Sequence, residues 1–382
     1  MKQTSKYLAD TGKFPIYKNT EVEYFKLGEQ MYESILKDLN DAKEFIFMEF
    51  FIIKSSFMWD SIKEILVAKA KEGLDVRLMY DDMGCMGHFP VKERLDLKNA
   101  GVKVVSFNRM KPIISSIMNN RDHRKLIVID GNIGYNGGIN IADEYINLKS
   151  PYGHWKDTGV RLYGEAVWNL SSMFLSLWEA YEKSSFDNSK FRPRTDIKYR
   201  SDGYIQPFSD SPFDYEALSN NVYLEIIWQA EEYVYIFTPY LIIDFEMTSA
   251  LKMAAKRGVD VRIVVPGIPD KKTVYELTQS YFEELMDAGV KIYKYTPGFI
   301  HAKSYISDDN VAIVGTINMD YRSLYLHFEC GTYMVNSSVI HDIKKDYMEV
   351  FEVSRLLNED DLNRSGIVRI YRAILRVASP LF

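Results

Sequence analysis

One short pattern of reactive residues occurs twice in this chain. The pattern is His-x-Lys-x4-Asp, and its copies begin 178 residues apart, at His123 and His301. A glycine and an asparagine follow each copy at the same offset, as Gly137 and Asn140 in the first copy and as Gly315 and Asn318 in the second. A duplicated module is the simplest explanation of this repetition. It predicts two similar domains related by a pseudo-twofold axis.

The residues around each copy follow the same order of hydrophobic patterns. In the first half, residues 45–53 read as a buried strand, 61–70 have helical spacing, and 73–80 alternate as a strand. In the second half the same order recurs at 233–239, 247–256 and 259–265, with Gly258 ending the helix. Strand-helix-strand units pair in parallel through right-handed crossovers. We therefore predict an α/β fold with mixed, mostly parallel sheets flanked by helices.

Changes in composition mark the expected domain boundaries. Residues 183–202 are polar and break the hydrophobic periodicity. We expect a first domain over residues 1–190 and a second over residues 203–360. Residues 361–382 form a basic segment, which contains Arg369, Arg372 and Arg376 and has no acidic residue after Asp361. As an amphipathic helix this segment either binds an anionic membrane surface or docks on its own domain.

Bulk properties restrict the class of partner. The net charge is −6, whereas a domain that grips nucleic acid usually carries a basic surplus, so we expect no nucleic acid partner. The two cysteines, Cys85 and Cys330, are far apart in the sequence, which argues against a disulfide framework or a zinc cage. No apolar run reaches the 18 or so residues of a membrane-spanning helix.

The spacing within the motif predicts which residues face the site. Alternate residues of a strand project to the same side, so His123 and Lys125 point together, as do His301 and Lys303. Asp130 lies an odd number of residues after His123, so on a strand it would project to the other face, and it begins an Asp-Gly-Asn turn. We expect Asp130 and its counterpart Asp308 to complete the catalytic motif by closing a turn, without contacting substrate.

These residue types suit transfer of a phosphoryl group through a histidine. A neutral imidazole can attack phosphorus while a second, protonated imidazole donates to the departing alkoxide. The lysines, together with Asn140 and Asn318, can bind the phosphate oxygens, so the predicted chemistry needs no metal or other cofactor. A histidine nucleophile also needs an orienting carboxylate, for which Asp157 and Glu329 are the candidates.

The chain resembles the phospholipase D superfamily, whose members carry two such motifs in one chain, and most of all the bacterial cardiolipin synthases. The resemblance extends from about residue 20 to the end of the chain. It rests on phrases such as Met48-Glu-Phe-Phe51, Asn136-Gly-Gly-Ile-Asn140, Trp155-Lys-Asp157 and Asn318-Met-Asp-Tyr-Arg-Ser323. Several long phrases in the right order are more diagnostic than the short motif alone.

The resemblance implies transfer of a phosphatidyl group between two phosphatidylglycerol molecules, giving cardiolipin and glycerol. It implies that His123 is the nucleophile and His301 the acid and base, although a pseudo-symmetric site could run either way. Asp157 and Glu329 match the acidic partners of the histidines. A hydrolytic phospholipase D, a nuclease-type phosphodiesterase and an inactive membrane-binding protein remain alternatives.

The chain departs from the pattern of this family in three places. Members usually begin with one or two hydrophobic anchor helices, which this sequence lacks, so we expect a truncated chain or a peripheral protein of the bacterial cell membrane. His327 stands where Asn is usual, and Thr316 where Ser is usual. His327 is either a packed strand residue or a third imidazole at the site. The apolar residues 110–118 either insert into the bilayer or pack in the core.

Overall fold

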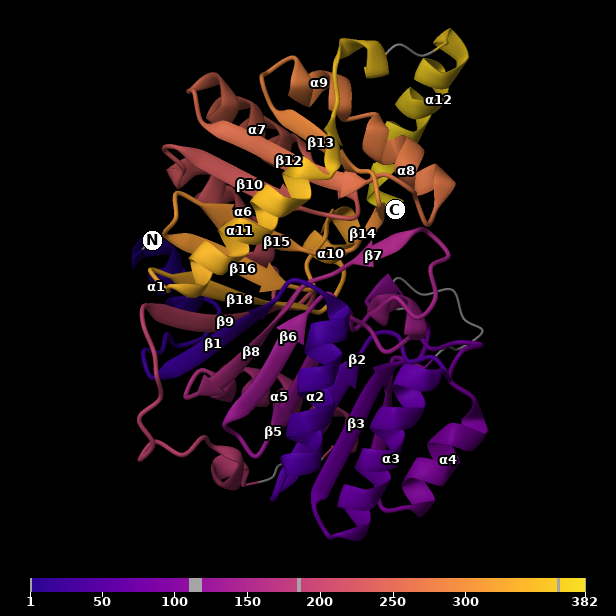
Figure 1. The fold of residues 1–382 in the computed structure, drawn as a ribbon, viewed down its shortest axis with the longest axis vertical. Coiled ribbons are helices and arrows are strands. Elements are labelled where there is room, and N and C mark those ends of the chain that lie inside the picture. The colour runs from indigo at the N-terminus through magenta and orange to yellow at the C-terminus, as the bar shows by residue number, and fades with distance from the viewer. Residues whose placement is uncertain (1, 110–118, 184–186, 363–364, 382) are drawn as a thin grey trace.

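The structure, a computed structural model, describes residues 2–109, 119–183, 187–362 and 365–381. It contains two α/β halves stacked one above the other (Figure 1). The segment 110–118, considered above for bilayer insertion, lies outside the described residues. No helix in the part of the chain described has the length and apolar character needed to cross a bilayer.

The first half is built on a seven-stranded mixed sheet. In spatial order its strands are β1 (Thr20–Phe25), β8 (Gly159–Gly164), β6 (Ile133–Gly137), β5 (Lys125–Ile129), β2 (Phe45–Phe50), β3 (Asp75–Asp81) and β4 (Lys103–Phe107). Helices α2 (Gly28–Asp41), α3 (Phe57–Lys71) and α4 (Val91–Asn99) pack in one core with one face of this sheet, and α5 (Val167–Glu182) packs against the other face.

The second half repeats this plan with eight strands. Their order is β19 (Ser354–Leu356), β13 (Lys291–Tyr295), β12 (Asp260–Pro266), β10 (Tyr233–Phe237), β15 (Ser304–Ser307), β16 (Val311–Gly315), β18 (Glu329–Val335) and β9 (Tyr204–Asp210). Helices α6 (Leu218–Gln229), α7 (Phe245–Lys256), α8 (Lys272–Gln279) and α9 (Phe282–Met286) share a core on one face, and α11 (Val339–Glu352) covers the other.

Local sequence explains where the predicted helices begin and end. Ser56 caps α3 by accepting from the backbone N–H of Trp59, and Asp244 caps α7 by accepting from that of Met247 (2.7 Å). Gly258 follows α7 with a φ of +96°, a conformation that glycine adopts without steric cost. The strands and helices expected from the repeated hydrophobic pattern are all present.

The expectation of mostly parallel sheets is wrong in one respect. Parallel pairing is confined to β2, β3 and β4 in the first sheet and to β10, β12 and β13 in the second, and the other neighbours pair antiparallel. One hairpin in each sheet accounts for part of the difference, because the motif strands β5 and β15 turn back at Asp130 and Asp308 to pair with β6 and β16. A hairpin needs no crossover helix, so its strands run antiparallel.

Contacts between the halves are reciprocal. Helix α5 of the first half lies against β9 of the second, and α11 of the second lies against β1 of the first. The core beneath these helices is continuous, since Phe47 and Phe174 belong to the same cluster as Phe237 and Tyr347. This shared core fixes the position of one half relative to the other.

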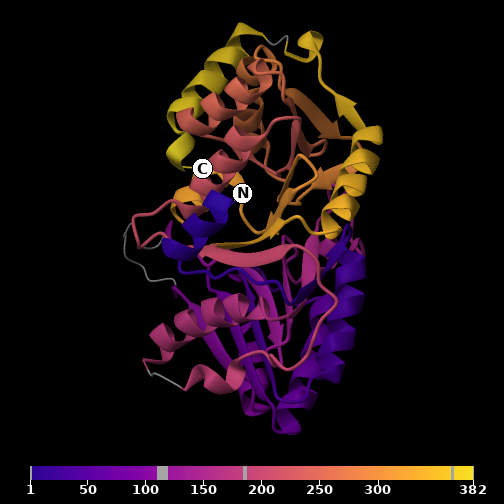
Figure 2. The ribbon, with the colours of Figure 1, turned by 90° about the vertical axis from the view of Figure 1, so that its left-hand side faces the viewer.

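The two ends of the chain depart from a simple division into halves. Helix α1 (Lys2–Asp10) packs on α6, and its Leu8 is buried in the second core, although residues 1–190 were expected to form the first domain. Helix α12 (Gly366–Val377), near the other end, docks on α8. Figure 2 shows both ends of the chain near the junction of the two halves.

Candidate active site

Each motif histidine lies where its own half pairs with the other half. In one place Asp122 forms a parallel bridge with Phe328, and the N–H of His123 donates to the carbonyl of Phe328 (2.9 Å). In the other, β14 (Gly298–Ile300) pairs in parallel with β7 (His154–Lys156), and the N–H of His301 donates to the carbonyl of Lys156 (2.7 Å). The residues that directly follow Phe328 and Lys156 are Glu329 and Asp157, the two candidate carboxylates.

The candidate carboxylates bind the histidines across the two halves. Nδ1 of His123 lies 2.8 Å from Oε1 of Glu329, and Nδ1 of His301 lies 2.6 Å from Oδ2 of Asp157. When Nδ1 donates to a carboxylate, Nε2 keeps its lone pair. That is the tautomer that a nucleophile or a proton acceptor requires. Neither half alone could orient its own histidine in this way.

Both histidines line one cavity of about 590 Å³ at the junction of the halves. Asn140 and Asn318 line the same cavity, so the structure brings together the motif residues expected to meet there. Oδ1 of Asn140 accepts from the N–H of Ile52 (3.0 Å), and its Nδ2 donates to the hydroxyl of Tyr145 (2.8 Å). Among the described residues, Oδ1 of Asn318 has no hydrogen-bond partner.

The motif lysines are buried next to the histidines. Nζ of Lys125 donates to the backbone carbonyl of His123 (2.5 Å), and Nζ of Lys303 donates to that of His301. Burial lowers the pKa of Lys125 to about 8 and that of Lys303 to about 7. Lys125 also lowers the pKa of Lys303, and each lysine is attracted to both candidate carboxylates. The cationic groups of the two modules therefore lie within electrostatic range of one another.

The histidines are neutral and their carboxylate partners ionised at neutral pH. Burial lowers the pKa of His123 to about 3 and that of His301 to about 4, because the charged imidazolium loses its solvation. Burial alone would raise the pKa of Glu329 and of Asp157. Attraction to the histidines and the hydrogen bonds that they donate outweigh the effect of burial, so the pKa of each carboxyl group is lowered. The hydroxyl of Thr316, which a serine would also supply, donates to Glu329.

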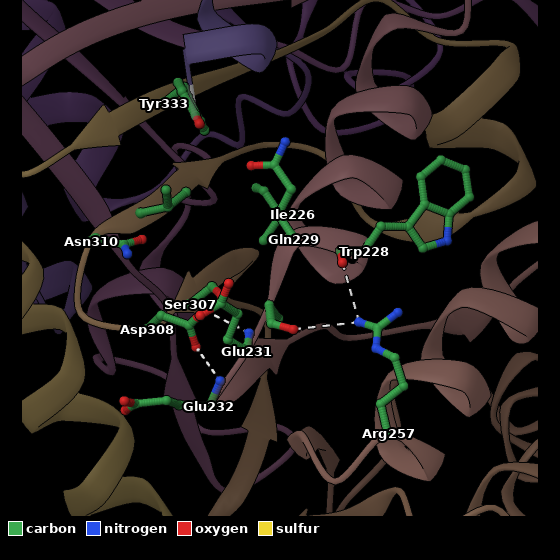
Figure 3. Close-up of a pocket in the computed structure, with 12 residues that line it drawn as sticks. Ile226, Trp228, Gln229, Glu231, Glu232, Arg257, Ser307, Asp308, Asn310 and Tyr333 are labelled. Atoms are coloured by element: carbon green, nitrogen blue, oxygen red, sulfur yellow. Dashed lines mark hydrogen bonds between the residues drawn. The ribbon is translucent and has the colours of Figure 1, made fainter.

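Asp130 and Asp308 lie at the far ends of the motif strands. The Asp130 carboxylate accepts from the N–H groups of Lys43, Glu44 and Phe45 at the start of β2, at 2.7–2.9 Å. Asp308 does the same at the start of β10, with Glu231, Glu232 and Tyr233. Asp308 lines a pocket of about 630 Å³ that shares no lining residue with the cavity of the histidines. Figure 3 shows its carboxylate beside Glu231 and Glu232. Both aspartates close turns, as expected.

His327 adds a third imidazole to the cavity wall. Its ring centroid is 5.7 Å from that of His123, and its Nδ1 is 3.8 Å from Oε1 of Glu329, too long for a hydrogen bond. Neither ring nitrogen has a hydrogen-bond partner in the described part of the chain. His123, His327 and Glu329 together could hold a metal ion, since their ligand atoms lie within 4.8 Å of one another. Of the two alternatives considered above, the structure favours the third imidazole at the site, since His327 lies just before β18 and lines the cavity.

Aromatic rings enclose the two histidines, and the sequence alone did not single them out. Phe51 presents its ring 5.0 Å from that of His123, while Tyr145 and Trp155 each lie 5.4 Å from the ring of His301. Phe51 and Trp155 occur in the phrases that carry the family resemblance, but nothing in the spacing of the three residues indicates contact with an imidazole. The rings of Phe51, Tyr145 and Trp155 shield the two histidines from water.

Comparisons with known proteins agree with this geometry. A sequence model of the family described as "Cardiolipin synthase, PLD-like domain" matches residues 35–165 and 223–352, one match in each half. The chain belongs to the cardiolipin synthase family of the phospholipase D superfamily. It is therefore an enzyme of that family, with two phospholipase D-like domains in one chain.

Relatives match almost the whole chain. An uncharacterized protein of Streptococcus mutans is 46% identical, over 99% of this chain and 82% of its own length. A cardiolipin synthase of Alkalihalophilus pseudofirmus is 37% identical, over 97% of this chain and 74% of its own length. Among solved structures, the phosphatidylserine synthase of Haemophilus influenzae matches with a TM-score of 0.73 and 14% identity, covering 99% of this chain and 98% of that one. The last match supports the fold.

Proposed function

We propose that this enzyme is a cardiolipin synthase, which moves a phosphatidyl group from one phosphatidylglycerol to another. The observation that carries the proposal is the pair of neutral histidines in one cavity, each held by a carboxylate from the other half. The similarity to cardiolipin synthases supports the choice of substrate. We place the reaction at the bacterial cell membrane, where the lipid is found.

In the proposed first step, Nε2 of His123 attacks the phosphorus of a bound phosphatidylglycerol. The bond from phosphorus to the headgroup glycerol breaks, and a protonated His301 donates its proton to the departing oxygen. Burial and Lys303 hold the pKa of His301 low in the protein, and an anionic phosphodiester in the cavity would raise it. The ammonium groups of Lys125 and Lys303, with the amides of Asn140 and Asn318, stabilise the phosphate oxygens.

In the second step the hydroxyl of another phosphatidylglycerol replaces glycerol. Its proton passes to His301, its oxygen bonds to phosphorus, and the bond to His123 breaks. The products are cardiolipin and the free enzyme. If water entered in place of the lipid hydroxyl, the product would be phosphatidic acid. Transfer and hydrolysis would then use the same residues of the site and differ only in the hydroxyl that attacks phosphorus.

Product analysis tests the proposal. The enzyme is incubated with vesicles of phosphatidylglycerol, and the lipid products and free glycerol are quantified. We expect cardiolipin and glycerol in equal amounts, no product with His123→Ala, and full activity with the control His88→Ala, which changes an exposed histidine. Phosphatidic acid without cardiolipin would overturn the transferase assignment.

A further inference from the structure

Helix α12 presents an apolar side to solvent. Five of its apolar residues recur at helical spacing and are 43–86% exposed, namely Ile367, Ile370, Tyr371, Ile374 and Val377. Leu381, just beyond the helix, is 72% exposed. A helix on the surface of a soluble protein normally turns such a stripe toward the core. In α12 the exposed fractions show that this stripe points toward solvent instead. The helix lies at the outer edge of the second half (Figure 1).

The opposite side of α12 is held by ion pairs. Arg372 contacts Glu276 and Arg376 contacts Glu284, both at 2.9 Å, while Arg369 contacts Glu283 at 3.3 Å. The Arg376 guanidinium also lies 4.4 Å above the ring of Tyr281. Among the aliphatic residues of the helix, Leu375 is buried in the second core. The helix therefore docks on its own domain, and the arginines that suggested an anionic membrane surface are already paired with α8 and α9.

The apolar side continues to the rim of the catalytic cavity. After α12, the short helix η5 (Ser379–Leu381) turns toward the junction of the halves, and Leu381 lines the cavity that holds His123 and His301. Arg322, also in the cavity wall, donates to the backbone carbonyl of Leu381 (3.2 Å). Exposed apolar side chains thus occur along α12 and again at Leu381, in the wall of the cavity where the lipid phosphate would react.

We propose that the apolar side of α12 inserts into the interfacial region of a phospholipid bilayer, between the headgroups and the acyl chains, and so brings the cavity to the membrane surface. This inference rests on the proposed function. A diacyl lipid with its phosphate between the histidines must extend its acyl chains out of the cavity, and those chains stay in an apolar phase only where the rim meets the bilayer. Ile367, Ile370 and Ile374 provide that contact, with Tyr371 at the headgroup level.

The ion pairs make a bilayer a better partner than an anionic protein or a purely electrostatic contact. With Arg372 and Arg376 engaged by glutamates, α12 offers little free positive charge, and its contribution to binding comes from apolar area. Binding to vesicles should then depend only weakly on ionic strength, since salt screens charges but does not weaken apolar burial.

The test compares two triple variants of the full chain. One carries Ile367→Ser, Ile370→Ser and Ile374→Ser on α12; the matched control carries Val91→Ser, Leu95→Ser and Met348→Ser, which alter exposed apolar residues on α4 and α11. Sedimentation with vesicles of phosphatidylcholine and phosphatidylglycerol measures binding, and turnover is measured on vesicles and on a short-chain, monomeric phosphatidylglycerol. Urea unfolding and light scattering report on folding and on oligomeric state.

We expect the α12 variant to partition at least about tenfold more weakly than the wild type and the control, in low and high salt alike. Its turnover of vesicle lipid should fall by a similar factor, and its turnover of the monomeric lipid should stay within about twofold of wild type. Unchanged sedimentation of the α12 variant would overturn the inference, as would wild-type binding that vanishes in high salt. A change in oligomeric mass with unchanged sedimentation would assign the surface to a second copy of the chain instead.

The two proposals fail in different ways. Sedimentation requires no chemistry, so weak binding by the α12 variant combined with no cardiolipin from the wild type would support the membrane contact and reject the synthase. Cardiolipin formation combined with unchanged sedimentation would support the synthase and reject the membrane contact.

Discussion

The two motif histidines share a hydrogen-bonding pattern but differ in their surroundings. Two residues before the carboxylate that binds His301 stands Trp155, an indole; two residues before the carboxylate that binds His123 stands His327, an imidazole. Both side chains line the cavity. The two sides of the pseudo-symmetric site are therefore chemically different, which allows the histidines to take different roles in one reaction.

Replacing the carboxylate beside His123 tests how the histidine is held. We expect Glu329→Gln to lower kcat by about 10²–10⁴-fold, because an amide can stabilise the wrong tautomer and carries no charge to balance an imidazolium. Stopped assays of cardiolipin formation measure the change. Thr316→Ser, which keeps the hydroxyl that donates to Glu329, should leave kcat within a few fold of wild type. Equal losses in both variants would contradict this role for Glu329.

The third imidazole should influence the pH dependence of the reaction. His327 contributes to lowering the pKa of His123, which burial sets at about 3. Removing it in His327→Asn should raise the pKa of His123, so the acid limb of kcat/KM should move to higher pH if His123 must be deprotonated to attack. Profiles of kcat/KM from pH 2 to 7 measure the limb, which the wild type should show near pH 3. An acid limb at the same or a lower pH would show that His327 does not act on His123.

The turns that follow the motif strands are stabilised by single carboxylates. Asp308 collects three backbone N–H groups from the start of β10, and Asp130 collects three from the start of β2. Both residues have a positive φ, of +49° and +50° respectively. A carboxylate in this position ties the end of each motif strand to the neighbouring strand and so fixes the register of the strand that carries the lysine.

Removing one of these carboxylates should cost stability more than chemistry. We expect Asp308→Ala to lower the free energy of unfolding by about 1–3 kcal/mol, since three N–H groups lose an ionised acceptor. The folded fraction should keep a kcat close to that of the wild type. Urea unfolding and active-site titration measure the two quantities, with Asp41→Ala, at an exposed aspartate, as control. A large fall in kcat at unchanged stability would instead indicate direct participation of Asp308 in the reaction.

Much of the fold could be predicted because its strands and helices have local signatures. The buried run at residues 45–53 and the capped, glycine-terminated helix near 247–256 both form as expected, as β2 and α7. The balance of parallel and antiparallel pairing was missed, because it depends on whether a connection is a hairpin or a helix crossover. A short strand such as β5 carries no sign of the direction of its neighbours.

The site was predictable in its members but not in its pairings. The repeat identifies His123 and His301, yet it does not show that Glu329 binds the first and Asp157 the second. Asp157 lies 34 residues after His123, whereas Glu329 lies 28 residues after His301, so the carboxylates fall outside the common offset. Their exchange between halves arises from two pairings between residues far apart in the sequence, β7 with β14 for Asp157 and Asp122 with Phe328 for Glu329.

The molecule as a whole should lose stability in acid through its two buried histidine–carboxylate pairs. The pKa values of His123 and His301 are about 3 and about 4 in the folded protein, below the 6.5 of the unfolded chain. The unfolded state therefore binds more protons below pH 6.5, and folding stability falls as pH is lowered through this window, by up to about 1.4 kcal/mol per pH unit for each histidine. The ionised Glu329 and Asp157, whose pKa values are lowered, act in the same direction at lower pH, as it falls below the 4.5 and 3.8 of the unfolded chain.

Urea unfolding at several pH values between 6.5 and 4.5 measures this slope. The double variant His123→Asn/His301→Asn should show a shallower slope than the wild type. A variant slope as steep as that of the wild type would place the acid sensitivity elsewhere in the protein.

The central claim is that the two halves form one site in which a histidine carries the phosphatidyl group. Rapid denaturation of the enzyme during turnover of phosphatidylglycerol, followed by mass spectrometry of its peptides, tests the claim directly. We predict a phosphatidyl adduct on His123 in the wild type, which is lost in His123→Ala. Cardiolipin formation at an undiminished rate by His123→Ala, or an adduct on a residue other than His123 and His301, would contradict it.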